Sequence, residues 1–365
     1  MKIVFCEIFS TTHLDPLKLK IEALSEVRGC QITVIGLQQF EREICDLPVT
    51  FLACKERNLA TAVKQIKEIS PEIVFFTTFI PNLSIIFNLF KLRKYKLLVS
   101  IQNAALWFGN TESKEIRYIV KKLLCSYSKR FFSSYFVGLK EMKTYIAEVS
   151  NNKYKVNVTP FSLPSYSKNN SGNDKIIVVV PGIYSTKRRD YFGLLEYISS
   201  NPSMFNKKAG NFRIIFLGAP STTDGGQKIF DKMKELDRIG YDVSYFDRFV
   251  TESVFVDHMR RANVILSPVN VTGHQHEIYG KTKDTGAFWD MFKFDTVGFV
   301  PKGLIIPEFA RHLAQSYTRY ECAFELMNGG ELNRCNTMTD DEISFMHIEY
   351  RQTLMKQITE VLEND

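Results

Sequence analysis

The chain has 365 residues, of which 45% are hydrophobic and 24% charged, and these proportions are typical of globular proteins. They exclude a disordered, collagen-like or disulfide-stapled chain, and at about 150 residues per domain the length favours two domains. A formal net charge of +7 permits an anionic partner but is too small to indicate nucleic-acid binding by itself.

The N-terminal residues 1–9 alternate in polarity and lack the long apolar core of a signal peptide, which predicts a first β-strand. The seven cysteines are odd in number, and no two have the C-x-x-C spacing of many metal and redox sites. We therefore expect reduced thiols in a cytoplasmic protein, without a disulfide framework and without a zinc cluster.

The first half of the chain alternates strand-like runs with segments of helical period. The runs are almost continuously apolar, which is typical of a parallel sheet buried between helices. A polar segment, residues 165–173, then interrupts the pattern and predicts a linker. The expected strands are 2–9, 31–37, 73–77, 96–101 and 135–139, and the expected helices are 16–27, 59–69 and 113–127.

After the linker the same alternation restarts. This pattern predicts an α/β fold of two Rossmann-like domains, residues 1–164 and 174–340, whose parallel sheets face each other across a cleft. The expected strands of the second half are 176–180, 213–217, 242–246, 264–266 and 297–300, and the expected helices are 191–199, 227–238, 253–261 and 341–362.

Basic residues interleaved with aromatic ones recur in the first half, at 91–96, 117–122 and 129–130. They follow an apolar stretch, 73–92, that a Pro-Asn pair interrupts, so we expect a strand, a turn and a helix there and not a membrane span. Two interpretations of the basic segments stay open. One is a surface that sits on anionic lipid, and the other is an ordinary solvated helix face.

Several motifs of nucleotide and metal chemistry are absent. The sequence Gly280-Lys281-Thr282 resembles the end of a phosphate-binding loop, but position 275 is Gln where that motif requires Gly. Neither G-x-G-x-x-G nor Asp-x-Asp occurs. His274 and His276 have no third ligand at metal spacing, so we expect no metal site.

A helix with a phosphate-binding start is expected after the strand at 264–266. The free N–H groups and partial positive charge of a helix N-terminus favour phosphate. Thr285 is the expected N-cap, and Gly286 would let a phosphate approach the backbone. Lys281 and Lys283 would add charge at the same place. The alternative is an ordinary capped helix with solvated lysines.

Other candidates follow expected strands, because open α/β sheets bind ligands beyond the carboxyl ends of their strands. His13 follows the first strand and is a candidate base, since an unperturbed His titrates near neutrality. Trp107 follows the strand at 96–101 and is a candidate platform for a sugar ring, with local packing as the alternative.

The order of these segments resembles that of GT-B glycosyltransferases, in particular the family-4-like group that builds bacterial surface polysaccharides. The resemblance covers nearly the whole chain. It implies that the first domain binds the acceptor, that the second binds a nucleotide-sugar, and that the last helix, residues 341–365, packs back on the first domain. The segments that carry it are 181–191, 214–218, 259–268 and 277–280, with weaker matches at 98–103, 135–142 and 158–160.

The resemblance also implies roles for single residues. Glu277 matches the first acid of a Glu-x7-Glu pattern that lies near the donor sugar, and with His13 it is the candidate catalytic residue. Thr285 stands at the position of the second acid, so Asp290 would instead hold the ribose hydroxyls. The expected donor-binding residues are Lys187, Arg188, Lys281, Lys283, Thr285, Gly286 and Asp290, and the acceptor-side residues are Gln102, Asn103 and Trp107.

Each of these residues has a plainer interpretation as well. Lys187 and Arg188 would then be exposed loop charges, Glu277 a partner of a neighbouring Lys, and Asp290 a solvated helix residue. Two positions also depart from the family pattern. Ile183 follows Gly182 where a basic residue is usual, and the His expected near Gln102 is absent.

The expected activity is transfer of a sugar from a nucleotide-diphosphate donor to a hydroxyl of a glycan or lipid-linked acceptor in surface polysaccharide synthesis. We expect a retaining reaction that needs no metal or other cofactor, in the cytoplasm or at the inner face of the cell membrane. Anionic membrane is an expected contact and nucleic acid is not. Two alternatives stay open: a non-catalytic subunit of a polysaccharide assembly complex, and a nucleotide-sugar epimerase of the same fold.

Overall fold

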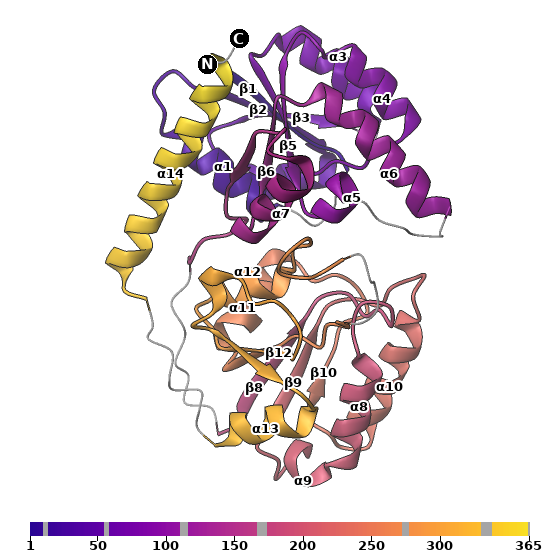
Figure 1. Cartoon of the computed structure of the whole chain (residues 1–365). Coiled ribbons are helices and arrows are strands. Elements are labelled where there is room, and N and C mark those ends of the chain that lie inside the picture. Colours follow the sequence, from indigo (N-terminus) through magenta and orange to yellow (C-terminus); the bar gives the residue numbers. More distant parts are fainter. Residues whose placement is uncertain are drawn as a thin grey trace. The chain divides into compact units, whose positions relative to one another are not determined.

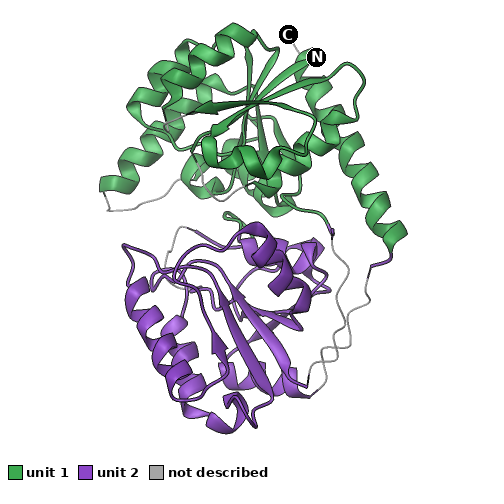
Figure 2. Cartoon of the chain, turned by 180° about the vertical axis from the view of Figure 1, so that it is seen from behind, with its two compact units in different colours: residues 1–163, 280–284, 340–365 green, residues 164–279, 285–339 purple. Residues whose placement is uncertain are grey.

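The structure is a computed structural model that describes residues 1–9, 14–54, 58–109, 116–165, 174–271, 277–329 and 338–363. The chain divides into two compact units, coloured separately in Figure 2. Unit 1 comprises Met1–Leu163, Gly280–Asp284 and Asp340–Asp365, and unit 2 comprises Pro164–Tyr279 and Thr285–Thr339. His13, His274, His276 and nearly all of the expected linker lie outside the described residues.

Unit 1 is built on a parallel sheet with helices packed on it (Figure 1). Among the described residues the strand order is β3-β2-β1-β4-β5-β6-β7, and the central strands are buried on both faces because helices cover them. The strands are β1 (Lys2–Glu7), β2 (Gln31–Leu37), β3 (Thr50–Cys54), β4 (Ile73–Phe76), β5 (Lys96–Ile101), β6 (Ser134–Val137) and β7 (Val156–Val158).

Asparagine side chains begin three helices of unit 1. Asn58, Asn82 and Asn103 each accept a hydrogen bond from a backbone N–H in the first helical turn, at 2.9–3.0 Å. Such a cap satisfies an N–H that has no partner within the helix. The helices are α1 (Asp15–Ser25), α2 (Glu41–Ile44), α3 (Leu59–Ile69), α4 (Leu83–Phe90), α5 (Ala104–Phe108), α6 (Ile116–Ser128), α7 (Lys140–Ser150) and α14 (Asp340–Glu363), with short 3₁₀ turns at Gln38–Phe40 and Lys129–Phe131.

The last helix, α14, belongs to unit 1 and packs against α1. Ion pairs join Arg351 to Glu26 and Lys155 to Glu360, the second with 3.2 Å between Nζ and Oε2. Helix α14 therefore adds a layer to a unit that the beginning of the chain builds. Its buried side chains recur at helical spacing and are Tyr350, Leu354, Ile358 and Val361.

Unit 2 repeats the architecture with the strand order β10-β9-β8-β11-β12-β13, again parallel throughout its described residues. Helices α8, α10 and α13 bury apolar side chains against this sheet in one core. The elements are β8 (Ile176–Pro181), α8 (Tyr191–Ser200), α9 (Pro202–Phe205), β9 (Phe212–Leu217), α10 (Gly226–Arg238), β10 (Val243–Ser244), α11 (Glu252–Arg261), β11 (Val264–Leu266), α12 (Gly286–Lys293), β12 (Gly298–Pro301), a 3₁₀ turn at Glu308–Ala310, β13 (Ala314–Tyr317) and α13 (Tyr320–Asn328).

The expected α/β fold of two Rossmann-like halves is confirmed, and the strands β2, β5 and β11 and the helix α3 have the expected bounds. Three strands, β3, β7 and β13, were not predicted. All three lie at an edge of their sheet, where one side of the strand has no neighbour. Edge strands are short and only partly buried, so their apolar pattern is weak.

Candidate functional site

In unit 2 the paired strands β8 and β11 mark the point where the strand order reverses, which is where open α/β sheets bind ligands. The loop after β8, residues 182–190, is bonded to the loop after β11 through the backbone. Arg189 and Val269 form an antiparallel bridge, and the N–H of Asn270 donates to the carbonyl of Arg188 at 2.9 Å. These backbone contacts therefore hold the loop 182–190 in place at the end of the sheet.

Arg189 lies directly against the backbone at the end of β8. Gly182 has φ of 109°, in the region that favours glycine, and a Cβ there would stand 2.4 Å from Nη2 of Arg189. Nη1 of Arg189 donates to the carbonyl of Ile183 at 3.2 Å, while the buried Nε has no acceptor among the described residues. A guanidinium thus lies against the backbone of Gly182 and Ile183, where the resemblance expects a basic residue in the sequence. The sequence reasoning missed it because only the run Lys187-Arg188-Arg189 signals it.

The loops after β8 and β9 also touch each other closely. A Cβ on Gly218 would stand 1.9 Å from the carbonyl oxygen of Gly182, so only glycine fits where the two loops cross. The N–H of Tyr184 donates to the carbonyl of Ala219 at 2.8 Å, and the N–H of Ser221 donates back to Tyr184 at 2.9 Å. The loops after β9, β8 and β11 therefore form one connected edge of unit 2.

Lys187 and Arg188 are both exposed on this edge. Nζ of Lys187 lies 3.2 Å from Oδ1 of Asp224, which follows β9. The hydrogen bond from Lys187 is the main reason that the pKa of Asp224 is lowered from its usual value. Lys187 is thus paired with a carboxylate in this state, while the side chain of Arg188 points to solvent.

The helix α12 begins at Gly286, as the sequence predicts. Thr285 takes the N-cap position with an extended backbone, but its side chain makes no capping hydrogen bond. A Cβ on Gly286 would meet no described residue within 4 Å, which leaves room for a ligand to approach the backbone closely as far as the described residues are concerned. Asp290 lies one turn into the helix and is half-buried.

The segment 280–284, which the sequence analysis placed in the second domain, belongs to unit 1. The reason is backbone bonding to the residues after β5. The N–H of Ala104 donates to the carbonyl of Thr282 at 2.7 Å, and the N–H of Asp284 donates to the carbonyl of Gln102 at 3.1 Å. These five residues therefore lie with unit 1, although they fall within the range 174–340 expected for the second domain.

This bonding brings together residues that the sequence analysis assigned to opposite substrates. Asn103, expected on the acceptor side, forms an antiparallel bridge with Lys283, expected on the donor side. Lys281 and Lys283 are half-buried within unit 1. The side chain of Asn103 caps α5 through Leu106, at 3.0 Å, which gives this residue a structural role whatever else it does.

Trp107 is only 5% exposed, because aromatic rings surround it. Its ring centroid lies 5.8 Å from that of Phe79, 6.0 Å from that of Phe132 and 6.4 Å from that of Tyr135. These contacts favour the packing alternative over stacking on a sugar. Glu277 is half-buried in the loop before Gly280, and His13 lies outside the described residues.

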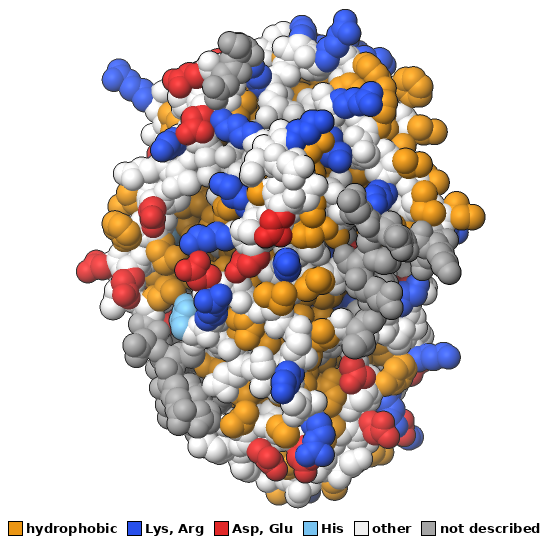
Figure 3. All heavy atoms as spheres, in the orientation of Figure 1, with side chains coloured by type: hydrophobic (Ala, Val, Ile, Leu, Met, Phe, Trp, Pro, Cys, Tyr) orange, Lys and Arg blue, Asp and Glu red, His pale blue; other side chains and the backbone are white. Residues whose placement is uncertain are grey.

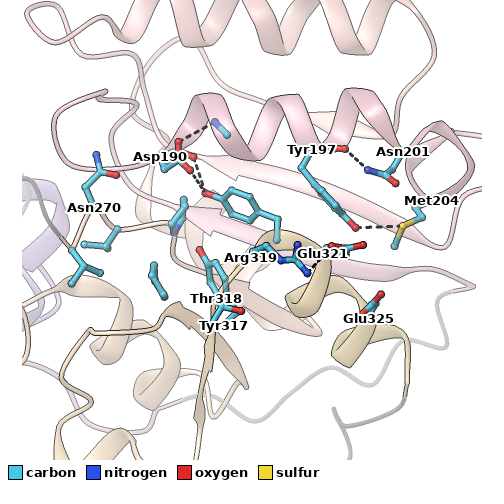
Figure 4. A pocket seen from close by; sticks show the side chains of 16 residues that line it. Asp190, Tyr197, Asn201, Met204, Asn270, Tyr317, Thr318, Arg319, Glu321 and Glu325 are labelled. Atoms are coloured by element: carbon cyan, nitrogen blue, oxygen red, sulfur yellow. Dashed lines mark hydrogen bonds and ion pairs between the residues drawn. The ribbon is translucent and has the colours of Figure 1, made fainter.

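Unit 2 also contains a hollow of about 760 Å³ between α8 and α13 (Figure 4). Asp190, which caps α8, accepts a hydrogen bond from the Tyr320 hydroxyl at its carbonyl, at 2.8 Å. The Tyr317 hydroxyl lies at the same hollow, and burial raises its pKa. None of the residues expected to bind the donor lines this hollow, although Asn270 belongs to both the hollow and the loop after β11.

Within the described ranges, no group of three or more His, Cys, Asp or Glu side chains is placed to hold a metal ion. The pair His274 and His276 lies outside those ranges.

Comparison with known proteins finds no matching family model and no matching curated protein. Solved structures do match, over nearly the full length. A glycosyltransferase from Rickettsia africae is 10% identical, with a TM-score of 0.59, over 100% of this chain and 99% of that one. HepE from Anabaena, in complex with UDP and glucose, is 12% identical with a TM-score of 0.62 over 100% of both chains.

An enzyme of another class has a similar structure. The UDP-GlcNAc 2-epimerase from Neisseria meningitidis, bound to UDP-GlcNAc, is 12% identical with a TM-score of 0.57, over 98% of this chain and 100% of that one. At such identities the likeness concerns the fold, and the family-4-like group stays a prediction. The two parallel sheets and these neighbours together show that the chain has the two-domain GT-B fold.

Proposed function

We propose that the protein is an enzyme that uses a nucleotide-diphosphate sugar and transfers the sugar to a hydroxyl of a glycan or lipid-linked acceptor in surface polysaccharide synthesis. The observation that carries this proposal is the guanidinium of Arg189 held against the end of the central strand of unit 2. Its support is that HepE, of similar fold, was solved with UDP and with UDP-glucose.

The diphosphate is the group that this part of unit 2 would stabilise. Negative charge builds up on the diphosphate as its bond to the sugar breaks, so fixed positive groups favour the transition state. In our proposal Arg189 and Lys187 supply charge from the loop after β8. The N-terminus of α12, at Thr285 and Gly286, supplies N–H groups and the positive end of the helix dipole.

The remaining candidates keep the roles that the resemblance implies. Asp290 would hold the ribose hydroxyls, since one carboxylate accepts from both, and Glu277 would lie near the donor sugar. Gln102 would face the acceptor, and His13 remains the candidate base. Lys281 and Lys283 enter the proposal as residues next to Gln102 and Asn103, because the structure pairs their segment with the end of β5.

The proposal includes retention of the anomeric configuration and activity without a divalent cation. Both rest on the resemblance and on the absence of Asp-x-Asp from the sequence. Proton NMR of the fresh product would show the α anomer from an α-linked donor if the reaction is retaining, and the β anomer would refute this part. Turnover after treatment with EDTA should equal that before it, and a loss restored by added metal would refute metal independence.

Calorimetric titration with a panel of nucleoside diphosphates tests the donor site. We expect one of them to bind, and its binding to weaken when Arg189 is replaced by Gln. Arg261→Gln is the matched control, since Arg261 is an exposed arginine of α11 paired with Asp257. Absence of binding by every member of the panel would overturn the proposal and favour the non-catalytic subunit.

Epimerisation is the second candidate, because the Neisseria epimerase matches the chain over almost its full length. The two reactions differ in what they require. An epimerase changes the sugar of its donor without an acceptor, whereas a transferase leaves the donor sugar intact until an acceptor accepts it. NMR spectra of the bound donor incubated with enzyme alone decide between them, and a new sugar epimer would overturn the transferase assignment.

A further inference from the structure

The helix α4 of unit 1 carries apolar side chains on its outer face. Leu83 and Phe87 are 68% and 69% exposed, and Phe90 continues the same stripe one turn later. The opposite face of the helix is apolar as well, with Ile85 and Leu89 buried. Core packing accounts for that second face, but it does not account for the exposed stripe.

The helix α6 turns its apolar stripe to solvent. An amphipathic helix of a globular protein normally turns its apolar stripe to the core. Among the side chains of α6, only those of Cys125 and Ser128 are buried. Its exposed stripe recurs at helical spacing and consists of Ile116 (77% exposed), Ile119, Val120, Leu123 (65% exposed) and Tyr127.

The two stripes form one surface, because α4 contacts α6. The ring of Phe90 lies 4.7 Å from that of Phe131 and 6.4 Å from that of Tyr127, measured between centroids. Figure 3 shows hydrophobic side chains gathered over these helices at one edge of unit 1, with Lys and Arg side chains among them. We call the exposed apolar residues of α4 and α6 the apolar face. They are Leu83, Phe87, Phe90, Ile116, Ile119, Val120, Leu123 and Tyr127. Contiguous exposed apolar surface of this kind marks an interaction site.

The two chain segments that carry the apolar face contain charges of a single sign. Residues 83–96 and 116–132 contain nine Lys and Arg residues and no Asp or Glu. Without these nine charges the formal net charge of the chain would be −2 instead of +7. These two segments alone therefore carry more positive charge than the net excess of the chain. The exposed members are Lys91, Arg93, Lys94, Arg117, Lys121 and Arg130.

We propose that the apolar face docks unit 1 on the surface of an anionic lipid bilayer. The apolar stripes of α4 and α6 would enter the boundary between headgroups and acyl chains, and the basic residues would contact the headgroups. The contact is peripheral, since no helix in the described part of the chain is long and apolar enough to cross a membrane. This inference stands independently of the proposed function.

The charge also argues for lipid over a second copy of the chain. A symmetric dimer through this surface would place the same patch against itself, and so would bring basic residues of both copies together. Like charges brought together across an interface oppose association. An anionic bilayer provides both the apolar layer and the opposite charge.

Flotation with vesicles tests the proposal on the full-length protein. The probes are vesicles of phosphatidylcholine alone and vesicles with about 30% phosphatidylglycerol. We expect the wild-type protein to float with the anionic vesicles only, and less at high salt. The double variant Phe87→Ser/Leu123→Ser should reduce the bound fraction at least tenfold, because it removes apolar area that would enter the bilayer. The double variant Arg93→Glu/Lys121→Glu should do the same, because each basic residue contributes about 1 kcal/mol.

Phe345→Ser is the matched control, because Phe345 of α14 is 65% exposed and lies outside the apolar face. It should float like the wild type, and all variants should keep the circular dichroism spectrum of the wild type. Failure of the wild type to bind anionic vesicles overturns the proposal. The proposal is also overturned if the wild-type protein sediments as a dimer and the variant Phe87→Ser/Leu123→Ser sediments as a monomer. Nucleoside diphosphate binding is measured on the same proteins. A variant that loses vesicle binding but keeps nucleoside diphosphate binding separates this proposal from the proposed function.

Discussion

Unit 2 repeats the order of the first six strands of unit 1, but the two units place opposite charges at the end of strands β1 and β8. In unit 1, β1 ends at Glu7, which is buried and accepts a hydrogen bond from the Thr77 hydroxyl. In unit 2, the corresponding strand, β8, ends beside the guanidinium of Arg189. The same fold thus offers an acidic, closed end in one unit and a basic, accessible edge in the other. A shared architecture fixes where a site can lie, while a few residues after the strands decide what it can bind.

The largest expected difference concerns a glycine at the end of the second strand of each unit, Gly36 within β2 and Gly218 directly after β9. Gly218→Ala should lower the free energy of unfolding by about 3 kcal/mol, because its Cβ meets the backbone of Gly182. Gly36→Ala, at the corresponding strand of unit 1, places Cβ 3.1 Å from the ring of Phe51, which can turn aside. It should cost no more than about 1 kcal/mol. Urea denaturation measures both, and equal losses would mean that the loops of unit 2 are no more tightly packed.

The buried lysine of unit 1 makes the stability of this unit depend on pH. Burial lowers the pKa of Lys20 from 10.5 to about 7, and the nearby Glu7 opposes part of this shift. Between these values the unfolded chain holds a proton that the folded chain has lost. The free energy of unfolding should therefore rise with pH, by up to about 1.4 kcal/mol per pH unit from this group.

Denaturation between pH 7 and about 7.5 checks this slope before the cysteines of the unfolded chain, whose ordinary pKa is about 8.5, ionise appreciably. Lys20→Met removes the titrating group and should flatten the slope. Lys67→Met, at an exposed lysine of α3, is the control and should keep it. A slope that persists in Lys20→Met would place its origin elsewhere in the molecule.

The basic edge of unit 2 should be felt in the binding of a nucleoside diphosphate. Arg189→Gln should weaken the bound nucleoside diphosphate about tenfold, or about 1.4 kcal/mol, since a charge-assisted hydrogen bond is lost. Arg189→Lys should recover part of it, because the charge remains while the planar fork is lost. Calorimetric titration measures both variants. Unchanged affinity in Arg189→Gln would remove this residue from the proposed site.

The smallest expected effect is a change in the pKa of Asp224 when its partner Lys187 is replaced. Lys187→Met should raise the pKa of Asp224 back toward its usual value, since the hydrogen bond from Lys187 is the main cause of the lowering. Carboxyl NMR signals followed through a pH titration measure it. If a diphosphate draws Lys187 away from Asp224, the same rise should appear in the wild type on binding. An unchanged Asp224 titration in Lys187→Met would contradict the pairing.

How far sequence reasoning reached depended on burial. The central strands were predicted because burial on both faces leaves an uninterrupted apolar signal. Helix α3 was predicted because its apolar residues recur at helical spacing. The start of α12 was predicted from Thr285-Gly286, since helix starts have local chemistry. The edge strands β3, β7 and β13 were missed, because their burial is partial.

Site residues were harder, because their neighbours are distant in sequence. Nothing local indicates that Arg189 lies against Gly182, seven residues earlier, or that Lys283 pairs with Asn103. For the region of the apolar face, the sequence left two interpretations open, a surface that sits on anionic lipid and a solvated helix face. Its exposed stripe on α6 became evident once the structure showed which face of the helix the core leaves uncovered.

The placement of α14 has a consequence for how the protein is made. Unit 1 begins with the first residues of the chain, yet Leu354 and Ile358 complete its packing from the other end of the sequence. A ribosome therefore finishes unit 2 before it releases the last part of unit 1. Until then, the surface of α1 that α14 covers stays open to other binding partners. A nonsense codon shortly before Asp340 would consequently damage unit 1, although most residues of that unit would already have been translated.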